Sequence, residues 1–358
     1  MSDANVVQLD EREAEIYDRQ IRLWGVAAQK RMQQARVLFL GVTALSAEVA
    51  KNLVLAGISV TLQDGNAVRG RDLGANFFLA AEDVGANRAE AARARVAELN
   101  PLASVEADPR PLEMVLADSS TWTSGRFNVI VMTTGTAQQQ RTVDLLCRSK
   151  EPVIAFYAGT LMGLEGWFFA DAGETYTFKK DKVPGEDEVF DSRSFVSLEV
   201  AEDASWDSLR SGRTFVPPTW VKAALLRQSE IEQLILGGAP EEQIGAALWE
   251  MSESFIRSKG EARPKLPGCA TEGDWLAAAA MAQAEVSPVA AIVGGMLAQE
   301  VIKVISNTGT PMNNLFAFDG LANEGREVCL GGQKVRPGRR VQEVEEIDII
   351  PLSSDEED

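Results

Sequence analysis

A continuous apolar run that ends in a glycine constrains the fold of this chain more than any other feature. Residues 36–40 read Arg-Val-Leu-Phe-Leu, the pattern of a strand that is buried on both faces of a parallel sheet. Gly41 follows at once, and a helix is then expected over 47–56, with Ser46 as its cap and Gly57 at its C′ position. A strand, a glycine turn and a helix in this order predict the first βαβ unit of a dinucleotide-binding domain.

The phosphate-binding loop of that unit lacks the glycines on which it depends. A G-x-G-x-x-G loop needs its second glycine so that a pyrophosphate can approach the backbone, but Thr43 stands there and Ser46 replaces the third glycine. Asp64 follows the strand expected over 58–62, about twenty positions after Gly41, where a ribose-binding carboxylate belongs. We interpret Gly41 and Asp64 as vestiges of a nucleotide site and expect no cofactor on this chain.

The first half of the chain alternates between helical and strand patterns. Helices are expected over 13–34, 85–99 and 137–149, and further apolar strands over 127–132 and 153–156. This alternation is typical of a doubly wound α/β sheet of the Rossmann type.

Changes in charge and in apolar periodicity along the sequence divide the chain into a sheet domain, an insertion and a tail. Charged residues without clear periodicity follow position 178, and two amphipathic helices are then expected over 219–235 and 240–258. The predicted divisions are 13–178 for the first part of the sheet domain, 179–268 for a small inserted domain, 269–332 for the second part of the sheet domain and 333–358 for a disordered acidic tail.

A second apolar block completes the sheet domain after the insertion. Ser287-Pro288 is typical of a helix start, and helical spacing continues over 288–305 before a strand at 315–318. Gly294-Gly295 lies in the middle of this helix, where each glycine lowers stability by about 1 kcal/mol. We expect these glycines to let another element approach closely.

Composition removes several classes of function. The 358 residues include no histidine, so Ser-His and Cys-His nucleophilic sites are excluded. Cys147, Cys269 and Cys329 form no C-x-x-C pair, so we expect neither a metal site nor a disulfide framework. The formal charge of −18 disfavours nucleic acid and suits a basic protein partner. The polar N-terminus shows no signal peptide, and no apolar run approaches the roughly 20 residues that span a membrane.

Five groups of residues carry a resemblance to a known family. They are Tyr17 to Gly25, Ala47 to Leu53 with Ala56-Gly57, Asn87 to Ala91, Gly159 to Gly173, and Pro288 to Lys303 with Asn313-Asn314 and Phe318-Asp319-Gly320. Together they resemble the ThiF/MoeB adenylation superfamily and, within it, the heterodimeric enzymes that activate ubiquitin-like modifiers. The resemblance covers about residues 13–178 and 269–332. It points to the subunit without the catalytic cysteine, in the SUMO branch.

Positions that bind the nucleotide in active members of this family differ here. The stretch 72–77 has Ala75 and Asn76 where active members carry an Arg-Gln pair, and Gly135 stands where they carry a magnesium-binding aspartate. Their paired zinc-binding C-x-x-C motifs and catalytic cysteine have no counterpart. The resemblance therefore implies an inactive, pseudo-adenylation domain, with ATP and Mg²⁺ bound by a partner subunit and no metal on this chain.

Arg19 is the residue through which the resemblance implies a catalytic contribution. In the family, the arginine of the motif Asp18-Arg19-Gln20 crosses to the nucleotide phosphates bound by the other subunit. The implied function is that of a regulatory subunit of a SUMO-activating heterodimer, which supports adenylation of the SUMO C-terminus and thioester formation on the partner. The implied partners are the catalytic subunit, SUMO and the conjugating enzyme. The implied location is the nucleus and also the cytoplasm.

The acidic tail contains a second candidate binding site. A short β-prone stretch there precedes a run of acids, as in SUMO-interacting motifs that add a strand to the sheet of the modifier. Its apolar residues are Ile347, Ile349, Ile350 and Leu352. Ser353 and Ser354 stand before acids and are candidate phosphorylation sites.

Four different functions stay open at this point. The chain could serve another ubiquitin-like modifier, or it could be a divergent Rossmann oxidoreductase, which measurable NADH binding would support. It could also be a self-sufficient adenylating homodimer of the MoeB kind, or a pseudoenzyme scaffold with no part in catalysis.

Overall fold

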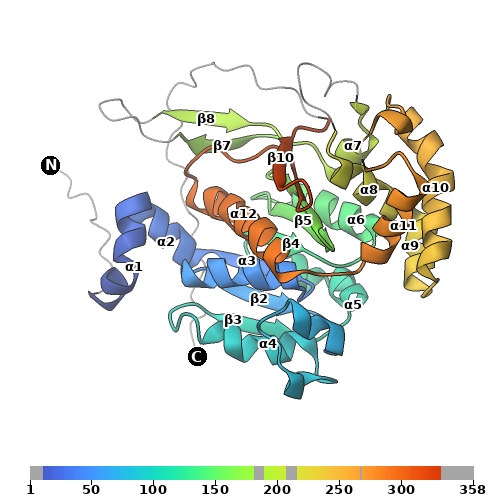
Figure 1. Ribbon diagram of the computed structural model, residues 1–358. Helices are drawn as coiled ribbons and strands as arrows, with labels where there is room; N and C mark the ends of the chain where they lie inside the picture. Colours follow the sequence, from blue (N-terminus) through green and yellow to red (C-terminus); the bar gives the residue numbers. More distant parts are fainter. Residues whose placement is uncertain (1–10, 181–188, 207–215, 267, 332–358) are drawn as a thin grey trace.

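The computed structural model describes residues 11–180, 189–206, 216–266 and 268–331 (Figure 1). The helices are α1 (Glu11–Trp24), α2 (Val26–Gln34), α3 (Ala44–Leu55), α4 (Arg88–Ala97), α5 (Leu112–Ala117), α6 (Ala137–Arg148), α7 (Leu198–Asp203), α8 (Pro218–Leu226), α9 (Ser229–Leu236), α10 (Glu241–Ser258), α11 (Glu272–Met281) and α12 (Ser287–Ser306). The strands are β1 (Arg36–Leu40), β2 (Ser59–Gln63), β3 (Val105–Asp108), β4 (Val129–Met132), β5 (Ala155–Met162), β6 (Glu165–Asp171), β7 (Tyr176–Lys179), β8 (Phe190–Arg193), β9 (Leu315–Asp319) and β10 (Glu324–Val328).

One large sheet organises these elements, with the strand order β10-β9-β6-β5-β4-β1-β2-β3. The strands β5, β4, β1, β2 and β3 run parallel. The strands β6, β9 and β10 extend the sheet by antiparallel pairing. The predicted doubly wound α/β fold is confirmed. The chain passes from β1 outward to β3 and then returns to β4 on the other side of β1. The carboxyl ends of β1 and β4 therefore form the switch point at which open α/β sheets bind ligands.

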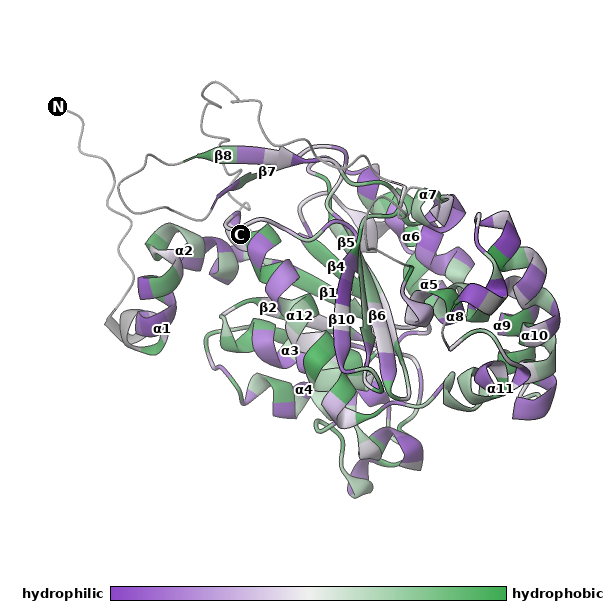
Figure 2. Cartoon of the chain, turned by 45° about the horizontal axis from the view of Figure 1, so that its top comes forward, coloured by the Kyte–Doolittle hydropathy of each residue, from purple (hydrophilic) through white to green (hydrophobic). Residues whose placement is uncertain are grey.

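Alternate side chains of β1 divide the core into two layers. Val37 and Phe39 belong to a buried cluster with residues of α3, α4 and α12, whereas Leu38 and Leu40 belong to a second cluster with residues of α6, α8 and α10. Because helices cover both faces, the central strands are apolar almost throughout, as Figure 2 shows for β1, β4 and β5.

The segment predicted as an inserted domain shares the second core layer with the sheet. Trp220 on α8 meets Trp167 on β6 edge to face, with ring centroids 5.3 Å apart. Leu248 on α10 lies in the same buried cluster as Ile130 on β4. The helices α8 to α10 of this segment, together with α11 from the part after it, form one side of the molecule, opposite α1 (Figure 1). The domain boundaries themselves stay a prediction, and the tail at 333–358 lies outside the described residues.

Two predicted helices are each divided in the structure. The helix expected over 13–34 breaks into α1 and α2 because Gly25 adopts φ +84° and ψ 162°, outside the helical region. The helix expected over 219–235 breaks into α8 and α9, with Arg227 and Gln228 as the cap residues between them. In both places the apolar spacing continues across the break, so spacing alone did not reveal it.

Helix α3 begins earlier than predicted because Thr43, not Ser46, caps it. The Thr43 hydroxyl accepts a hydrogen bond from the Ser46 backbone at 3.3 Å, and the Ser46 hydroxyl accepts one from the Thr43 backbone at 2.7 Å. This reciprocal arrangement is a capping box, with Ser46 as the third helical residue. Gly57, at φ +92°, follows the end of the helix as predicted.

Helix α12 confirms one expectation and corrects another. A Cβ atom on Gly294 would lie 2.6 Å from Cβ of Glu48 on α3, so the predicted close approach is confirmed at Gly294. At Gly295 it is wrong, because no heavy atom lies within 4 Å of its Cβ position. By length and composition, however, α12 is apolar enough to cross a membrane, contrary to the expectation that no such stretch exists. Most of its apolar length is buried against α3 and the sheet, which makes it a core helix.

Candidate functional site

The turn after β1 is closed by the neighbouring strand. Gly41 has φ +102°, and a Cβ atom there would collide with Cγ2 of Thr134. Thr134 comes from the loop after β4, and its hydroxyl donates to the Leu40 carbonyl at 3.2 Å. Gly41 is therefore retained for its backbone conformation and its contact with Thr134. The space next to it holds a side chain of the protein.

A carboxylate of the chain occupies the helix N-terminus that would bind a phosphate. The Ala44 backbone nitrogen donates to both carboxylate oxygens of Glu285, at 3.2 and 3.0 Å. Thr43 and Ser46 bind each other's backbone N–H groups in the same turn. A phosphate at a helix N-terminus needs such N–H groups to be free. Burial raises the pKa of Glu285 above its ordinary value, and the bond from Ala44 opposes that shift.

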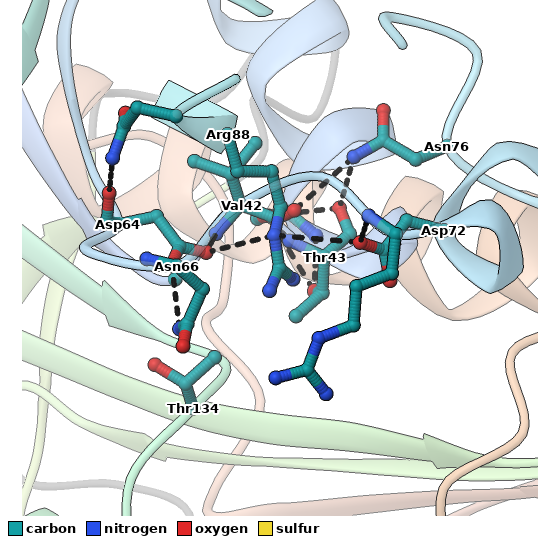
Figure 3. Close-up of polar contacts among 12 residues, drawn as sticks. Val42, Thr43, Asp64, Asn66, Asp72, Asn76, Arg88 and Thr134 are labelled. Carbon is teal, nitrogen blue, oxygen red and sulfur yellow. Dashed lines mark hydrogen bonds and ion pairs between the residues drawn. The ribbon is translucent and has the colours of Figure 1, made fainter. Parts of the chain in front are cut away.

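Asp64, the vestigial ribose ligand, is held entirely by its own chain (Figure 3). It is only 2% exposed. One carboxylate oxygen accepts from the Val42 nitrogen at 2.9 Å, and the other accepts from the backbone and side chain of Asn66 at 2.9 and 2.8 Å. Arg88 Nε lies 3.4 Å away in an ion pair. Asp64 therefore braces the turn after β1, and its oxygens are already in use.

The other diverged positions likewise serve the fold. The side-chain amide of Asn76 donates to the Val42 carbonyl at 3.2 Å, and its oxygen accepts from the Phe78 nitrogen at 3.1 Å (Figure 3). Ala75 is buried in the core. Gly135 has φ +85°, and a Cβ atom there would lie 2.7 Å from Met132. Within the described residues, no group of three acids or cysteines could hold a metal ion. These residues do not fit ATP with Mg²⁺.

A second carboxylate lies at the other helix that starts at the switch point. Glu232 on α9 accepts a hydrogen bond from the Ala137 nitrogen, the first residue of α6, at 2.8 Å. Burial raises the pKa of Glu232 above its ordinary value. Beside it lies a cavity of about 680 Å³ between the carboxyl ends of the strands and the helices α8 and α9. Glu232 and Glu285 were not found by sequence reasoning, because each is an isolated acid whose partner is a distant backbone N–H.

The helix α1 presents Arg19 at the opposite end of α3. Tyr17 is fully buried, where the Asn100 side chain donates to its hydroxyl at 2.9 Å. Gln20 donates to the Leu55 carbonyl, at the last residue of α3, at 3.1 Å. Arg19 itself is exposed, and no hydrogen bond or ion pair joins it to the part of the chain that the structure describes. Tyr17 and Gln20 therefore hold α1 against the rest of the chain, and Arg19 between them faces solvent.

Arg19 cannot serve the turn of its own chain. Its helix docks at the C-terminal end of α3, whereas the turn at Gly41 lies at the N-terminal end. Twelve residues of helix separate the two, which is about 18 Å. An arginine side chain extends far less than that. The side chain of Arg19 therefore does not reach the turn at Gly41.

The remaining candidate residues fall into two groups. Cys147 and Cys269 are buried, and burial raises the pKa of the Cys269 thiol to about 12, so it is no nucleophile at neutral pH. Cys329 is partly buried. The candidate SUMO-binding residues and both candidate phosphorylation sites lie outside the described residues.

The fold and this site define a nucleotide-binding α/β domain whose own phosphate and ribose positions are filled by its side chains. The sequence profile of the ThiF family matches residues 17–337, and the chain belongs to that family. It is 33% identical over 353 residues to SUMO-activating enzyme subunit 1 of Xenopus tropicalis, covering 91% of this chain and 98% of that protein. It is 32% identical over 348 residues to the human protein of the same name, covering 90% and 96%.

More distant comparisons agree. SUMO-activating enzyme subunit 1 of Danio rerio is 31% identical over 346 residues, covering 88% of this chain and 94% of that protein. The crystal structure of PaaA in its selenomethionine form superposes with a TM-score of 0.53 at 15% identity, covering 92% of this chain and 78% of that one. At that identity the structural likeness supports the fold alone.

Proposed function

We propose that this chain is the regulatory subunit of a heterodimeric SUMO-activating enzyme and that Arg19 reaches ATP bound by the partner. The names of its relatives support the enzyme. The proposed roles of the two subunits rest on what lies at the two ends of α3. Glu285 fills the phosphate position at one end, and Arg19 faces solvent at the other.

The proposed chemistry is the adenylation of a carboxylate. The C-terminal carboxylate of SUMO attacks the α-phosphate of ATP, and pyrophosphate leaves. The guanidinium of Arg19 offers permanently charged, bidentate contacts to phosphate oxygens as charge develops on them. The partner's cysteine then attacks the acyl adenylate, forms a thioester and releases AMP. In this proposal ATP and Mg²⁺ are bound by the partner subunit, and the isolated chain is inactive.

Further parts of the proposal rest on the sequence alone. The tail residues Ile347, Ile349, Ile350 and Leu352 bind SUMO by adding a strand to its sheet. Phosphorylation of Ser353 or Ser354 adds negative charge beside that stretch. The heterodimer also meets the conjugating enzyme and works in the nucleus and the cytoplasm.

The test is ATP–pyrophosphate exchange that depends on SUMO. We expect exchange when this chain is mixed with the catalytic subunit and none from this chain alone. Arg19→Ala should lower the exchange rate by about a thousandfold, the smaller end of the range for an arginine supplied in trans. Size-exclusion chromatography checks that the variant still forms the heterodimer.

A matched control lies one turn further along the same helix. Arg22 is 77% exposed on its side chain and, among the described residues, pairs with Asp18 at 3.0 Å. Exposed pairs of this kind contribute little, so Arg22→Ala should keep both the heterodimer and the exchange rate. Equal rates for Arg19→Ala and the wild type would instead favour a scaffold with no part in catalysis.

The same assay distinguishes a homodimer from a subunit for a different modifier, and a separate binding measurement tests for an oxidoreductase. Exchange by the chain alone would support a self-sufficient homodimer. Exchange that a different modifier elicits, but SUMO does not, would move the chain to another branch of the family. Binding of NADH by the purified chain would support the oxidoreductase.

A further inference from the structure

The C-terminal end of α3 is bound by side-chain amides from three other segments of the chain. A helix leaves its last four carbonyls without an intrahelical partner. Three consecutive carbonyls at this end each accept a hydrogen bond from an amide: that of Val54 from Asn100 at 2.8 Å, that of Leu55 from Gln20 at 3.1 Å, and that of Ala56 from Gln29 at 3.0 Å. The amides therefore determine which elements can dock on this end of the helix.

Two of the three amides belong to the helices at the end of the molecule that carries Arg19 (Figure 1). Gln20 follows Arg19 on α1, and Gln29 is fully buried on α2. The side-chain oxygens of both glutamines have no hydrogen-bond partner among the described residues. Since buried polar atoms are nearly always paired, each amide leaves one atom unsatisfied in order to place its NH₂ group on α3. The fold uses these glutamines as donors.

The third amide, that of Asn100, binds α1 as well as α3. Asn100 is 3% exposed, and its oxygen accepts from the Leu102 nitrogen at 3.0 Å. Its nitrogen donates to the Val54 carbonyl at 2.8 Å and to the Tyr17 hydroxyl at 2.9 Å. An amide nitrogen carries two N–H groups, so both are used. Asn100 thus links the helix of Arg19 directly to the end of α3.

Helix α1 needs such anchors of its own because Gly25 separates it from α2. The backbone of Gly25 lies outside the helical region, so α1 does not continue the axis of α2. Helix α2 is held by Gln29 and by Arg31, whose guanidinium donates to the Ser306 carbonyl at 2.9 and 2.6 Å. The direction of α1 therefore depends on the contacts that Tyr17 and Gln20 make.

We propose that Asn100 and Gln29 are positioning residues for Arg19. Their amides fix α1 and α2 against the end of α3, so that the guanidinium of Arg19 is held at the phosphates of a nucleotide on the partner subunit. Neither residue touches a reacting atom, and both act through Arg19. This inference rests on the proposed function, because it requires Arg19 to contact the partner's ATP.

The test uses SUMO-dependent ATP–pyrophosphate exchange by the reconstituted heterodimer. Asn100→Leu and Gln29→Leu each remove the amide and keep a side chain of similar size. We expect each to lower the exchange rate by about ten- to a hundredfold, since a displacement of about 1 Å at a catalytic group can cost a hundredfold in rate. Wild-type rates in both variants would overturn the proposal.

A matched control removes a buried asparagine amide elsewhere in the fold. Asn314 is fully buried, and its side chain donates to the Leu330 carbonyl at 2.8 Å and accepts from the Leu330 nitrogen at 3.0 Å. Asn314→Leu should therefore lose hydrogen bonds similar to those of Asn100→Leu but keep the exchange rate within about twofold of the wild type. An equal loss of rate in Asn314→Leu and Asn100→Leu would overturn the proposal, because it would reflect a general loss of structure.

A double substitution distinguishes positioning from a structural role. If Asn100 acts through Arg19, adding Asn100→Leu to Arg19→Ala should lower the residual exchange rate by less than about twofold. A residue that only stabilises the fold lowers the rate by the same factor whether or not Arg19 is present. A full further loss in the double variant would overturn the proposal.

A milder pair of variants applies if Asn100→Leu does not fold. Tyr17→Phe removes only the hydroxyl that accepts from Asn100. Tyr157 is 2% exposed and donates to the Glu300 carbonyl at 3.1 Å, so Tyr157→Phe is the matched control. We expect a several-fold loss of exchange for Tyr17→Phe and none for Tyr157→Phe. Wild-type exchange by Tyr17→Phe would contradict the link between Asn100 and α1.

The two proposals fail in different ways. Wild-type exchange by Arg19→Ala would overturn the role of Arg19 and, with it, the role of the amides. A low rate for Arg19→Ala together with wild-type rates for Asn100→Leu and Gln29→Leu would overturn the positioning role alone.

Discussion

The carboxylate of Glu285 lies on the first N–H group of helix α3, with one oxygen 3.0 Å from the Ala44 nitrogen. The two residues are far apart in the sequence, and Glu285 belongs to the segment that leads into α12. The contact therefore joins the two parts of the sheet domain at the N-terminus of α3, where a Rossmann-type domain binds a phosphate.

Two variants of Glu285 measure separately how its charge and its hydrogen bond contribute to stability. Glu285→Ala leaves the Ala44 N–H unpaired, and loss of such a cap lowers the free energy of unfolding by about 1 kcal/mol. Glu285→Gln keeps an oxygen acceptor and removes a partly buried charge, so it should be as stable as the wild type at pH 7. Urea denaturation of the three proteins checks this order.

The difference in stability between Glu285→Gln and the wild type should depend on pH, because the pKa of Glu285 changes on folding. Burial raises its folded pKa above the unfolded value, so its protonated form is favoured on folding. The stability it contributes is complete below the unfolded pKa, about 4.3, and is lost as pH rises through the folded pKa. Glu285→Gln should therefore gain on the wild type as pH rises from 4 to 7. A gain with falling pH would contradict the assignment.

Gly57 controls the position of the helix that carries Arg19. It has φ +92°, and a Cβ atom there would lie 2.7 Å from the Tyr17 hydroxyl. Gly57→Ala should therefore displace α1 and lower SUMO-dependent exchange in the heterodimer. Gly25→Ala is the control, because Gly25 also has a positive φ, +84°, but no heavy atom lies within 4 Å of its Cβ position. Its effect should be limited to backbone strain of about 1–3 kcal/mol. Equal losses of exchange in both variants would contradict the contact argument.

The neighbouring glycines of α12 should respond in opposite directions. Gly294→Ala forces a methyl group against Glu48, and overpacking of this kind lowers stability by about 1–3 kcal/mol. Gly295→Ala meets no atom within 4 Å and should raise stability by up to about 1 kcal/mol, since alanine favours a helix. Denaturant midpoints of the two variants and the wild type measure both changes. Destabilisation by both would show that the two glycines are not packed differently.

The sequence predicted the strands β1, β2, β4, β5 and β9 and the altered loop because these depend on local patterns, but it did not predict the buried strand β6. Leu38 and Leu40 are buried with their neighbours as a parallel strand requires, and Thr43 stands where a glycine is needed. The strand β3 was not predicted, because it has only one fully buried residue, and β10 was missed because it is an exposed edge. Edge strands lack the apolar signal of buried ones.

The contacts that fill the site could not be predicted, because they join residues distant in sequence. Glu232 binds α6 from α9, and Glu285 binds α3 from the segment before α12. A single acid has no periodic signature, and its partner in each case is a backbone N–H, which every sequence offers. Only the folded chain shows that these acids lie at the N-terminal ends of α3 and α6.

A buried pair of carboxyl groups fastens the insertion to the sheet and should make stability depend on pH. Asp144 on α6 accepts a hydrogen bond from the Leu198 nitrogen, the first residue of α7, at 2.6 Å. Asp171 on β6 lies close to it and pairs with Arg148 at 2.6 Å. Burial, and then the negative charge of Asp171, raises the pKa of Asp144 to about 8. Folding therefore favours the protonated form of Asp144.

The sign of the effect follows from the unfolded pKa of an aspartate, about 3.9. Folding takes up a proton between these two pKa values, so the stability contributed by Asp144 is complete below pH 4 and is lost as pH rises through about 8. The slope from one such proton is at most about 1.4 kcal/mol per pH unit. The side chain introduced by Asp144→Asn has an oxygen that can accept from the Leu198 N–H and an N–H group that can donate to Asp171. It does not titrate. Urea denaturation from pH 5 to pH 8 should show a flatter profile for this variant than for the wild type, with its largest advantage at pH 8. Parallel profiles would mean that Asp144 is ionised in the folded protein.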